Sequence, residues 1–140
     1  LAHLRELVTL KFLGLAGTLV TDAGLIHLTA LTALKTLDLY GTEVTDAGIT
    51  HLAMLPTLET LNLAVTSVTD AGVADLSRVE TLRSLGLHAT QVTDLGLTHL
   101  KGLRFLEALD VSNTQVTHAG VTELQETLPD CVIVNGKPIF

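Results

Sequence analysis

The sequence predicts an α/β fold, a solenoid of strand–turn–helix units that stack one on another. Three observations support this fold class. Leucine recurs with a period of 24 residues; the equivalent positions are Leu10, Leu34, Leu58, Leu82 and Leu106. Each period contains an alternating segment typical of a strand and then a spacing typical of a short helix. Self-similarity on this length scale indicates a stack of similar supersecondary units.

The strand comes first in each unit. Leu37 and Leu39 alternate with polar neighbours, and this period of two predicts a strand with one buried face. The equivalent pairs in the other units are Leu13/Leu15, Leu61/Leu63, Leu85/Leu87 and Leu109/Val111. A threonine then stands in the turn that follows each strand; these residues are Thr18, Thr42, Thr66, Thr90 and Thr114. We expect their hydroxyls to bond unpaired backbone groups and to form a ladder along the stack.

The helix follows the turn, within the segment Val-Thr-Asp-Ala-Gly-Leu-x-x-Leu. Thr45 or Asp46 is the expected N-cap, because a short side-chain oxygen can accept a free helix N–H. Ile49 and Leu52 give the helix one apolar edge. The repeated acids at the helix starts complement the helix dipole; they are Asp22, Asp46, Asp70 and Asp94.

A glycine recurs in the first turn of every expected helix; the set is Gly24, Gly48, Gly72, Gly96 and Gly120. Glycine costs about 1 kcal/mol relative to alanine inside a helix. Its presence in every unit therefore indicates a geometric requirement, and we expect a neighbouring backbone to approach closely at this position.

The two ends of the chain depart from the repeat. We expect a single domain over residues 1–140, with full repeats from residues 10, 34, 58, 82 and 106. Residues 1–9 read as the tail of a truncated repeat, so upstream repeats or another chain would cover this end, and self-association there is one alternative. Residues 129–140 form the expected closing segment, with a last strand at Val132–Val134 and a turn at Asn135–Gly136. Terminal units of a stack need such covers.

The 24-residue block resembles the leucine-rich repeat pattern L-x-x-L-x-L-x-x-N-x-L, with Thr42 and its equivalents in the Asn position. The V-T-D-A-G-L-x-x-L half is similar to the subclass found in F-box substrate receptors and many bacterial repeat proteins. The resemblance implies a right-handed, horseshoe-shaped solenoid with a concave parallel sheet and short convex helices. It implies a binding function but no particular partner, because leucine-rich repeats serve many unrelated binding tasks. No F-box-like helical segment precedes the repeats, so a ubiquitin-ligase function is not inferred.

Composition narrows the classes of partner. The chain is 47% hydrophobic but only 3% aromatic, which suits an aliphatic core better than an enzyme rich in pockets. A net charge of −7 argues against nucleic acid, because phosphate binding requires a surplus of Lys and Arg. No apolar run approaches the roughly 20 residues that span a bilayer, and no signal peptide is visible. The lone Cys131 excludes an internal disulfide and is compatible with a reducing, cytoplasmic compartment.

The concave face is the expected binding surface. Its positions beside the buried leucines hold different residue types in successive units, so the backbone does not dictate them. The candidate binding residues there are Asp38, Tyr40, Asn62, His88 and Asp110. Tyr40 suits a binding hot spot, although a surface tyrosine without function is an equal alternative.

Metal binding and catalysis have less support. His3, His27, His51 and His99 form one column, which we expect on the solvent side of the helices as repeated surface residues, without a metal or other cofactor. His88 and Asp110 lie on neighbouring strands, but no serine or cysteine is expected in register as a nucleophile. We therefore predict a non-catalytic module that binds a protein or peptide. The alternatives are the recognition arm of a larger enzyme or signalling protein, such as an F-box-like receptor or bacterial effector, and a structural spacer.

Overall fold

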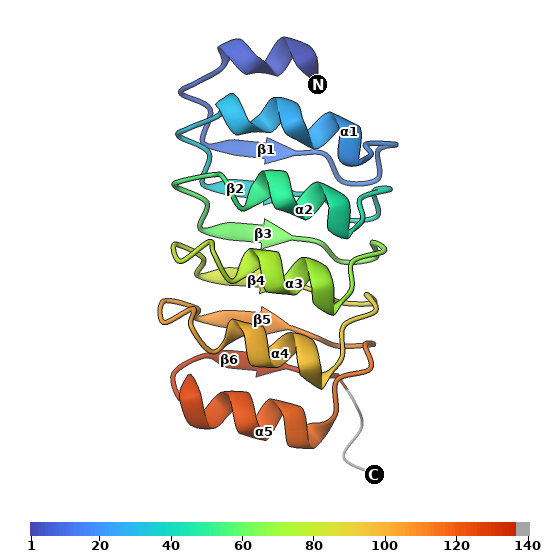
Figure 1. The fold of residues 1–140 in the computed structure, drawn as a ribbon, viewed down its shortest axis with the longest axis vertical. Coiled ribbons are helices and arrows are strands. Elements are labelled where there is room, and N and C mark those ends of the chain that lie inside the picture. The colour runs from blue at the N-terminus through green and yellow to red at the C-terminus, as the bar shows by residue number, and fades with distance from the viewer. Residues whose placement is uncertain (137–140) are drawn as a thin grey trace.

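The computed structural model describes residues 1–136, which form a stack of strand–turn–helix units (Figure 1). The strands make one six-stranded parallel sheet in the order β1-β2-β3-β4-β5-β6. Their bounds are Phe12–Gly14 (β1), Thr36–Asp38 (β2), Thr60–Asn62 (β3), Ser84–Gly86 (β4), Ala108–Asp110 (β5) and Val132–Val134 (β6). The expected open solenoid with a parallel sheet is confirmed.

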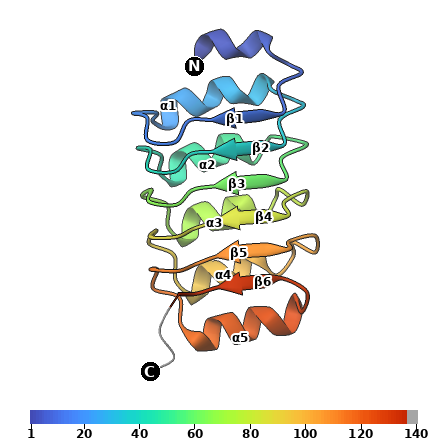
Figure 2. The same cartoon turned by 180° about the vertical axis from the view of Figure 1, so that it is seen from behind.

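The helices all lie on one side of this sheet, and the other side is left open (Figure 2). Their bounds are Asp22–Leu25 (α1), Asp46–Leu52 (α2), Asp70–Leu76 (α3), Asp94–Leu100 (α4) and His118–Thr127 (α5). Two 3₁₀ segments stand at the N-terminal end, Ala2–Glu6 (η1) and Ile26–Ala30 (η2), and η2 continues α1 directly. No helix within residues 1–136 is long and apolar enough to cross a bilayer.

Strand pairing places equivalent residues of successive units side by side. Leu61 pairs with Leu37 on one side and Leu85 on the other. The predicted last strand, β6, is also confirmed, and it pairs with β5 so that Ile133 lies beside Leu109. A period of 24 residues in the sequence thus becomes a row of side chains across the sheet.

These rows build one continuous hydrophobic core that runs from Leu25 to Cys131. The leucines of the central strands are at most 1% exposed, as Leu37, Leu61 and Leu85 show. Partly buried residues such as Leu13 and Ile133 extend the core toward its two ends. A single unit is too small to bury its own apolar side, so the stacking of neighbours supplies the stability.

The turn threonines bond within their own unit. The hydroxyl of Thr42 donates to the carbonyl oxygen of Leu39 at 2.8 Å, three residues earlier in the chain. Thr66 and Thr90 repeat this bond to Leu63 and Leu87. The expected ladder between hydroxyls is therefore wrong, because each hydroxyl donates its proton to a carbonyl of its own turn.

The aspartates at the helix starts join neighbouring units. Oδ1 of Asp46 accepts the backbone N–H of Thr69 at 2.8 Å, and Oδ2 accepts the Thr69 hydroxyl at 2.6 Å. The same pair of bonds links Asp22 to Thr45, Asp70 to Thr93 and Asp94 to Thr117. We call this series the Asp–Thr ladder. It ends at His118, which begins α5 in the position of the aspartates.

The threonines of the ladder also cap the helices. Oγ1 of Thr45 accepts the N–H of Ala47 at 3.4 Å, and Thr69 and Thr93 make the equivalent bond. Of the two residues considered for the N-cap, the threonine therefore holds it. One hydroxyl donates to the preceding unit and accepts from its own helix, so capping and stacking are coupled.

Removal of one rung is expected to destabilise the stack. Asp70→Ala leaves the N–H and hydroxyl of Thr93 without their acceptors, which should lower the free energy of unfolding by about 1–2 kcal/mol because these groups are only partly buried. Asp70→Asn should lose less, because an amide oxygen can still accept the N–H. Urea unfolding measures both, with Asp75→Ala as a control for charge. Equal midpoints for Asp70→Ala and Asp75→Ala would contradict the ladder.

The helix glycines make room for the same ladder. A Cβ atom added to Gly72 would overlap Oδ1 of Asp46, and Gly96 and Gly120 face the carboxylates of Asp70 and Asp94 in the same way. The expected close approach is confirmed, but the expected backbone neighbour is wrong at these positions. The neighbour is the aspartate side chain of the preceding unit, held in place by its two bonds to threonine.

Candidate functional site

The open face of the sheet, which is the side away from the helices, carries three rows of side chains. They project from the strand positions on either side of the buried leucines and from the second residue beyond each of the first five strands. The rows are Phe12, Thr36, Thr60, Ser84, Ala108 and Val132; then Gly14, Asp38, Asn62, Gly86, Asp110 and Val134; and then Ala16, Tyr40, Ala64, His88 and Ser112.

The five predicted binding residues lie on this face in two groups. Asp38 on β2 and Asn62 on β3 are partners in the pairing register, and Tyr40 stands two residues after β2. Asp110 stands on β5 and His88 two residues after β4, beyond the gap left by Gly86. Tyr40 is the most exposed of the five, at 47%, and the other four residues are half-buried.

Asp38, Asn62 and Asp110 have a structural task that the sequence analysis did not assign. In each, Oδ1 accepts the backbone N–H two residues later, at 3.0, 3.1 and 2.9 Å respectively. Such short side chains commonly satisfy the backbone where a strand turns away. The bond fixes each side chain against the open face. Within residues 1–136 no donor contacts the Oδ2 atoms of Asp38 and Asp110.

Ser112 connects His88 to Asp110. Nδ1 of His88 lies 2.8 Å from the Ser112 hydroxyl, and that hydroxyl donates to Oδ1 of Asp110 at 2.5 Å. The expectation that no serine stands in register is therefore wrong, because Ser112 lies one repeat after His88. The hydroxyl proton points to the carboxylate, so the serine accepts from Nδ1–H. A nucleophilic serine would instead donate to the histidine. The two hydrogen bonds therefore orient the imidazole of His88 and do not activate Ser112.

Exposed apolar side chains complete the open face, and none of them was among the predicted binding residues. Phe12 is 63% exposed at one end, and Val132 and Val134 are 66% and 50% exposed at the other. A shallow hollow of about 150 Å³ lies beside the valines, over Gly86 and Ala108. Extending the alignment of the rows to residues 132 and 134 would have found the two valines.

Phe105 is a further exposed residue that the sequence analysis missed. It is 61% exposed and lies three residues before β5 begins. The Arg83 guanidinium lies 5.9 Å from the centre of its ring. Its equivalents Thr57 and Thr81 use their hydroxyls to bond carbonyls that lie 23 to 25 residues earlier in the chain. The replacement of threonine by phenylalanine at this one repeat position was the signal available in the sequence.

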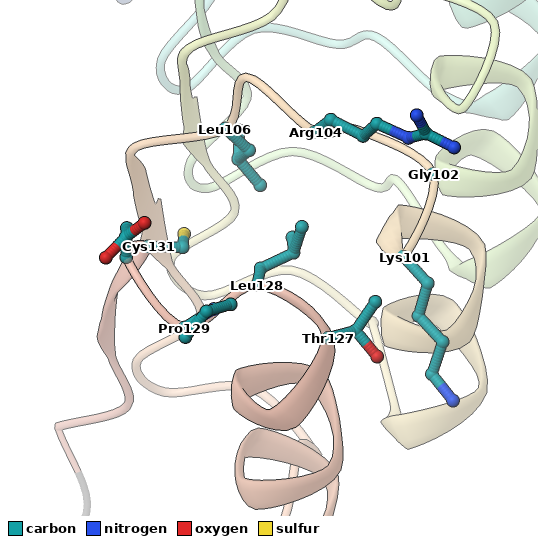
Figure 3. Close-up of a pocket in the computed structure, with 9 residues that line it drawn as sticks. Lys101, Gly102, Arg104, Leu106, Thr127, Leu128, Pro129 and Cys131 are labelled. Atoms are coloured by element: carbon teal, nitrogen blue, oxygen red, sulfur yellow. The ribbon is translucent and has the colours of Figure 1, made fainter.

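A hollow near the C-terminal end holds the single cysteine and has a volume of about 370 Å³ (Figure 3). Cys131 lies at one end and Lys101 at the other. The thiol belongs to a residue only 3% exposed, and burial raises its pKa. A reactive cysteine needs the opposite shift, so Cys131 is a buried cover for the core.

The histidine column is less exposed than expected. His3 faces solvent, but His27, His51 and His99 are half-buried. Nδ1 of His27 is shielded and has no partner within residues 1–136, and desolvation, followed by the charges of Arg5 and the N-terminus, lowers the pKa of this imidazole. No group of three or more His, Cys, Asp or Glu side chains in the described part of the chain could hold a metal ion.

Stacked units with a leucine spine, a parallel sheet and helices on one side define the leucine-rich repeat fold. Solved structures agree with this class. An internalin C2 from Listeria monocytogenes superposes with a TM-score of 0.81 at 22% identity, over 96% of this chain and 55% of that protein. A leucine-rich repeat protein of Leptospira interrogans gives 0.74 at 22% identity, over 95% and 33%. A second Listeria monocytogenes internalin, InlF, gives 0.56 at 18% identity, over 96% and 50%.

These similarities show that the chain has the leucine-rich repeat fold. The chain spans between a third and just over half of the length of the three proteins. No protein-family model and no curated protein matches its sequence.

Proposed function

We propose that this chain is a non-catalytic module that binds a protein or peptide through the open face of its sheet. The observation that carries the proposal is the variation along the three rows of that face. Equivalent positions hold glycine, aspartate, asparagine and valine in the central row. Positions that serve stacking, in contrast, repeat the same residue from unit to unit, as the Asp–Thr ladder does.

The shape and chemistry of the face support a macromolecular partner. Its hollow beside β6 is shallow, whereas a small molecule is usually held in a deeper cleft. Tyr40 and Phe12 offer large exposed rings with few torsions to restrict, which is typical of residues that anchor interfaces. The oriented imidazole of His88 adds a polar contact of fixed direction. The same face would serve a recognition arm of a larger protein.

Affinity capture from extracts of the source organism tests this proposal. The immobilised chain is compared with Tyr40→Ala/His88→Ala, which changes the open face, and with His51→Ala/His99→Ala, which changes the helix side. We expect the first variant to lose the captured protein and the second to retain it.

Two results would end the proposal. If all three forms retain the same proteins, the open face is not the contact surface. If none captures a protein, the chain acts as a spacer, which is the competing function. Size-exclusion chromatography of the same samples separates capture of a partner from self-association through the N-terminal end, where Leu7 and Val8 are about half exposed.

A further inference from the structure

The open face carries negative charge and no fixed positive charge. Its three rows contain Asp38 and Asp110 but no Lys or Arg. Three basic side chains elsewhere have acidic partners in neighbouring units. Lys35 pairs with Glu59 at 2.7 Å, and Arg83 pairs with Glu107 at 2.6 Å; Lys101 and Glu123 make a third such pair at the same distance as the second. Within residues 1–136 no Lys or Arg pairs with Asp38 or Asp110, so these carboxylates remain available to a cation from outside.

Each of the two carboxylates is held in a fixed orientation. Oδ1 of Asp38 is occupied by the N–H of Tyr40, and Oδ1 of Asp110 accepts both the N–H and the hydroxyl of Ser112. These bonds leave the Oδ2 atoms as the free acceptors. Because the side chains are already ordered, an incoming guanidinium or ammonium group would lose less affinity to side-chain ordering.

An apolar surface lies directly beside the second carboxylate. Asp110 itself lines the hollow of about 150 Å³ together with Ala108, Val132 and Val134. Val134 is the partner of Asp110 in the pairing of β5 with β6. An aliphatic side chain placed here would cover the two exposed valines.

We propose that the open face binds an extended peptide segment with two basic residues four positions apart and an aliphatic residue two positions beyond the second. This inference rests on the proposed function and specifies its partner. The first basic residue pairs with Asp38, the second with Asp110, and the aliphatic residue enters the hollow at Val132 and Val134.

The spacing follows from the sheet. Asp38 and Asp110 are separated by three strand intervals, which is about 14 Å at about 4.8 Å per interval. An extended peptide that crosses the strands covers the same distance in four residues, at about 3.4 Å each. Side chains of an extended segment alternate between its two sides, so positions 1, 5 and 7 all face the sheet. Position 7 then lies about 20 Å from position 1, close to Val134 at four strand intervals.

Fluorescence anisotropy with synthetic heptapeptides tests the inference. The probe is the capped, dye-labelled peptide Arg-Ser-Thr-Ser-Arg-Ser-Leu, made also in the reverse order to allow either direction of crossing. The register control is Arg-Ser-Arg-Ser-Thr-Ser-Leu, which has the same composition and charge. We expect the tighter-binding order of the probe to bind at least about fivefold more tightly than the register control, a ratio at the upper end for an exposed ion pair.

Variants of the chain assign the contacts. Asp38→Asn and Asp110→Asn keep an oxygen for the backbone N–H, so the fold should persist, and each should weaken the probe about fivefold. Val132→Thr should weaken it about threefold through loss of apolar contact. Glu126→Gln removes one charge from the exposed surface of α5 and should leave binding unchanged. Circular dichroism confirms that each variant is folded.

Three outcomes would overturn the inference: no binding of either probe order, equal binding of the register control, or equal weakening by Glu126→Gln and Asp110→Asn. The proposed function fails separately, through the capture experiment. A chain that captures a protein through Tyr40 and His88 but ignores the probe keeps its proposed function and loses only the basic, aliphatic partner.

Discussion

Leu61→Ala is expected to lower the free energy of unfolding by about 3–5 kcal/mol, the largest effect of any single change considered for this protein. Leu61 is 1% exposed on the central strand β3, where it lies between Leu37 and Leu85. Its truncation removes buried methyl groups and leaves a cavity that rigid neighbours fill only in part. The site is also the junction of two halves of a stack whose stability depends on contacts between neighbours.

Urea unfolding followed by far-UV circular dichroism measures this loss. Leu19→Ala is the matched control, because Leu19 is 83% exposed and the same atoms are removed. The control should stay within about 0.5 kcal/mol of the parent. A comparable loss in both variants would mean that the row of leucines is not the main source of stability.

Hydrophobic positions of this fold could be predicted from sequence because burial follows two simple periods. Alternation around Leu37 and Leu39 placed the strand, and the spacing of Ile49 and Leu52 placed the helix. Both pairs of residues are fully buried in the structure. The last strand at Val132–Val134 was predictable for another reason, because a run of β-branched residues precedes the turn residues Asn135 and Gly136.

Polar contacts between units could not be predicted, because each depends on which atoms meet across the stack. The sequence showed that Asp46 and Thr69 recur, but the helix dipole already explained the acid and capping explained the threonine. Only the coordinates show that the carboxylate reaches the next unit. For the turn threonines the prediction failed in the opposite direction. A ladder between units was expected, but the Thr42 hydroxyl bonds a carbonyl of its own turn.

The candidate site also has features that could be predicted from the sequence and features that could not. Exposure of Tyr40 and of the row from Asp38 to Asp110 followed from strand alternation. The backbone bond made by Asp38 and the bridge from His88 through Ser112 to Asp110 required hydrogen-bond directions. Residue numbers alone bring His88 and Ser112 side by side, one repeat apart, but they do not say which of the two donates.

Gly48→Ala is expected to lower the free energy of unfolding by about 2–3 kcal/mol, although alanine is the better helix former. Propensity alone would favour alanine by about 1 kcal/mol. A Cβ atom at this position, however, would overlap Oδ1 of Asp22 and stand 2.8 Å from Cδ1 of Leu25. It would also lie 3.2 Å from the Cα atom of Asp22, so a rotation of the carboxylate cannot relieve the whole clash. Overpacking of this kind costs about 1–3 kcal/mol.

The displaced carboxylate adds a second loss, because Asp22 then gives up its bonds to the N–H and hydroxyl of Thr45. Each such bond contributes about 0.5–1.5 kcal/mol. Together the two losses exceed the gain in propensity. Gly102→Ala is the control, since nothing lies within 4 Å of its added Cβ, and it should leave the urea midpoint nearly unchanged.

A double-mutant cycle separates the clash from the helix itself. Asp22→Ala removes the carboxylate that the new methyl group meets, so Asp22→Ala and Gly48→Ala should together cost at least about 1 kcal/mol less than the sum of their separate losses. Additive losses would mean that the glycine serves its own helix and not the Asp–Thr ladder. Non-additivity would show that glycine and aspartate, which lie in different units, form one joint that recurs along the stack because each unit must seat the carboxylate of the unit before it.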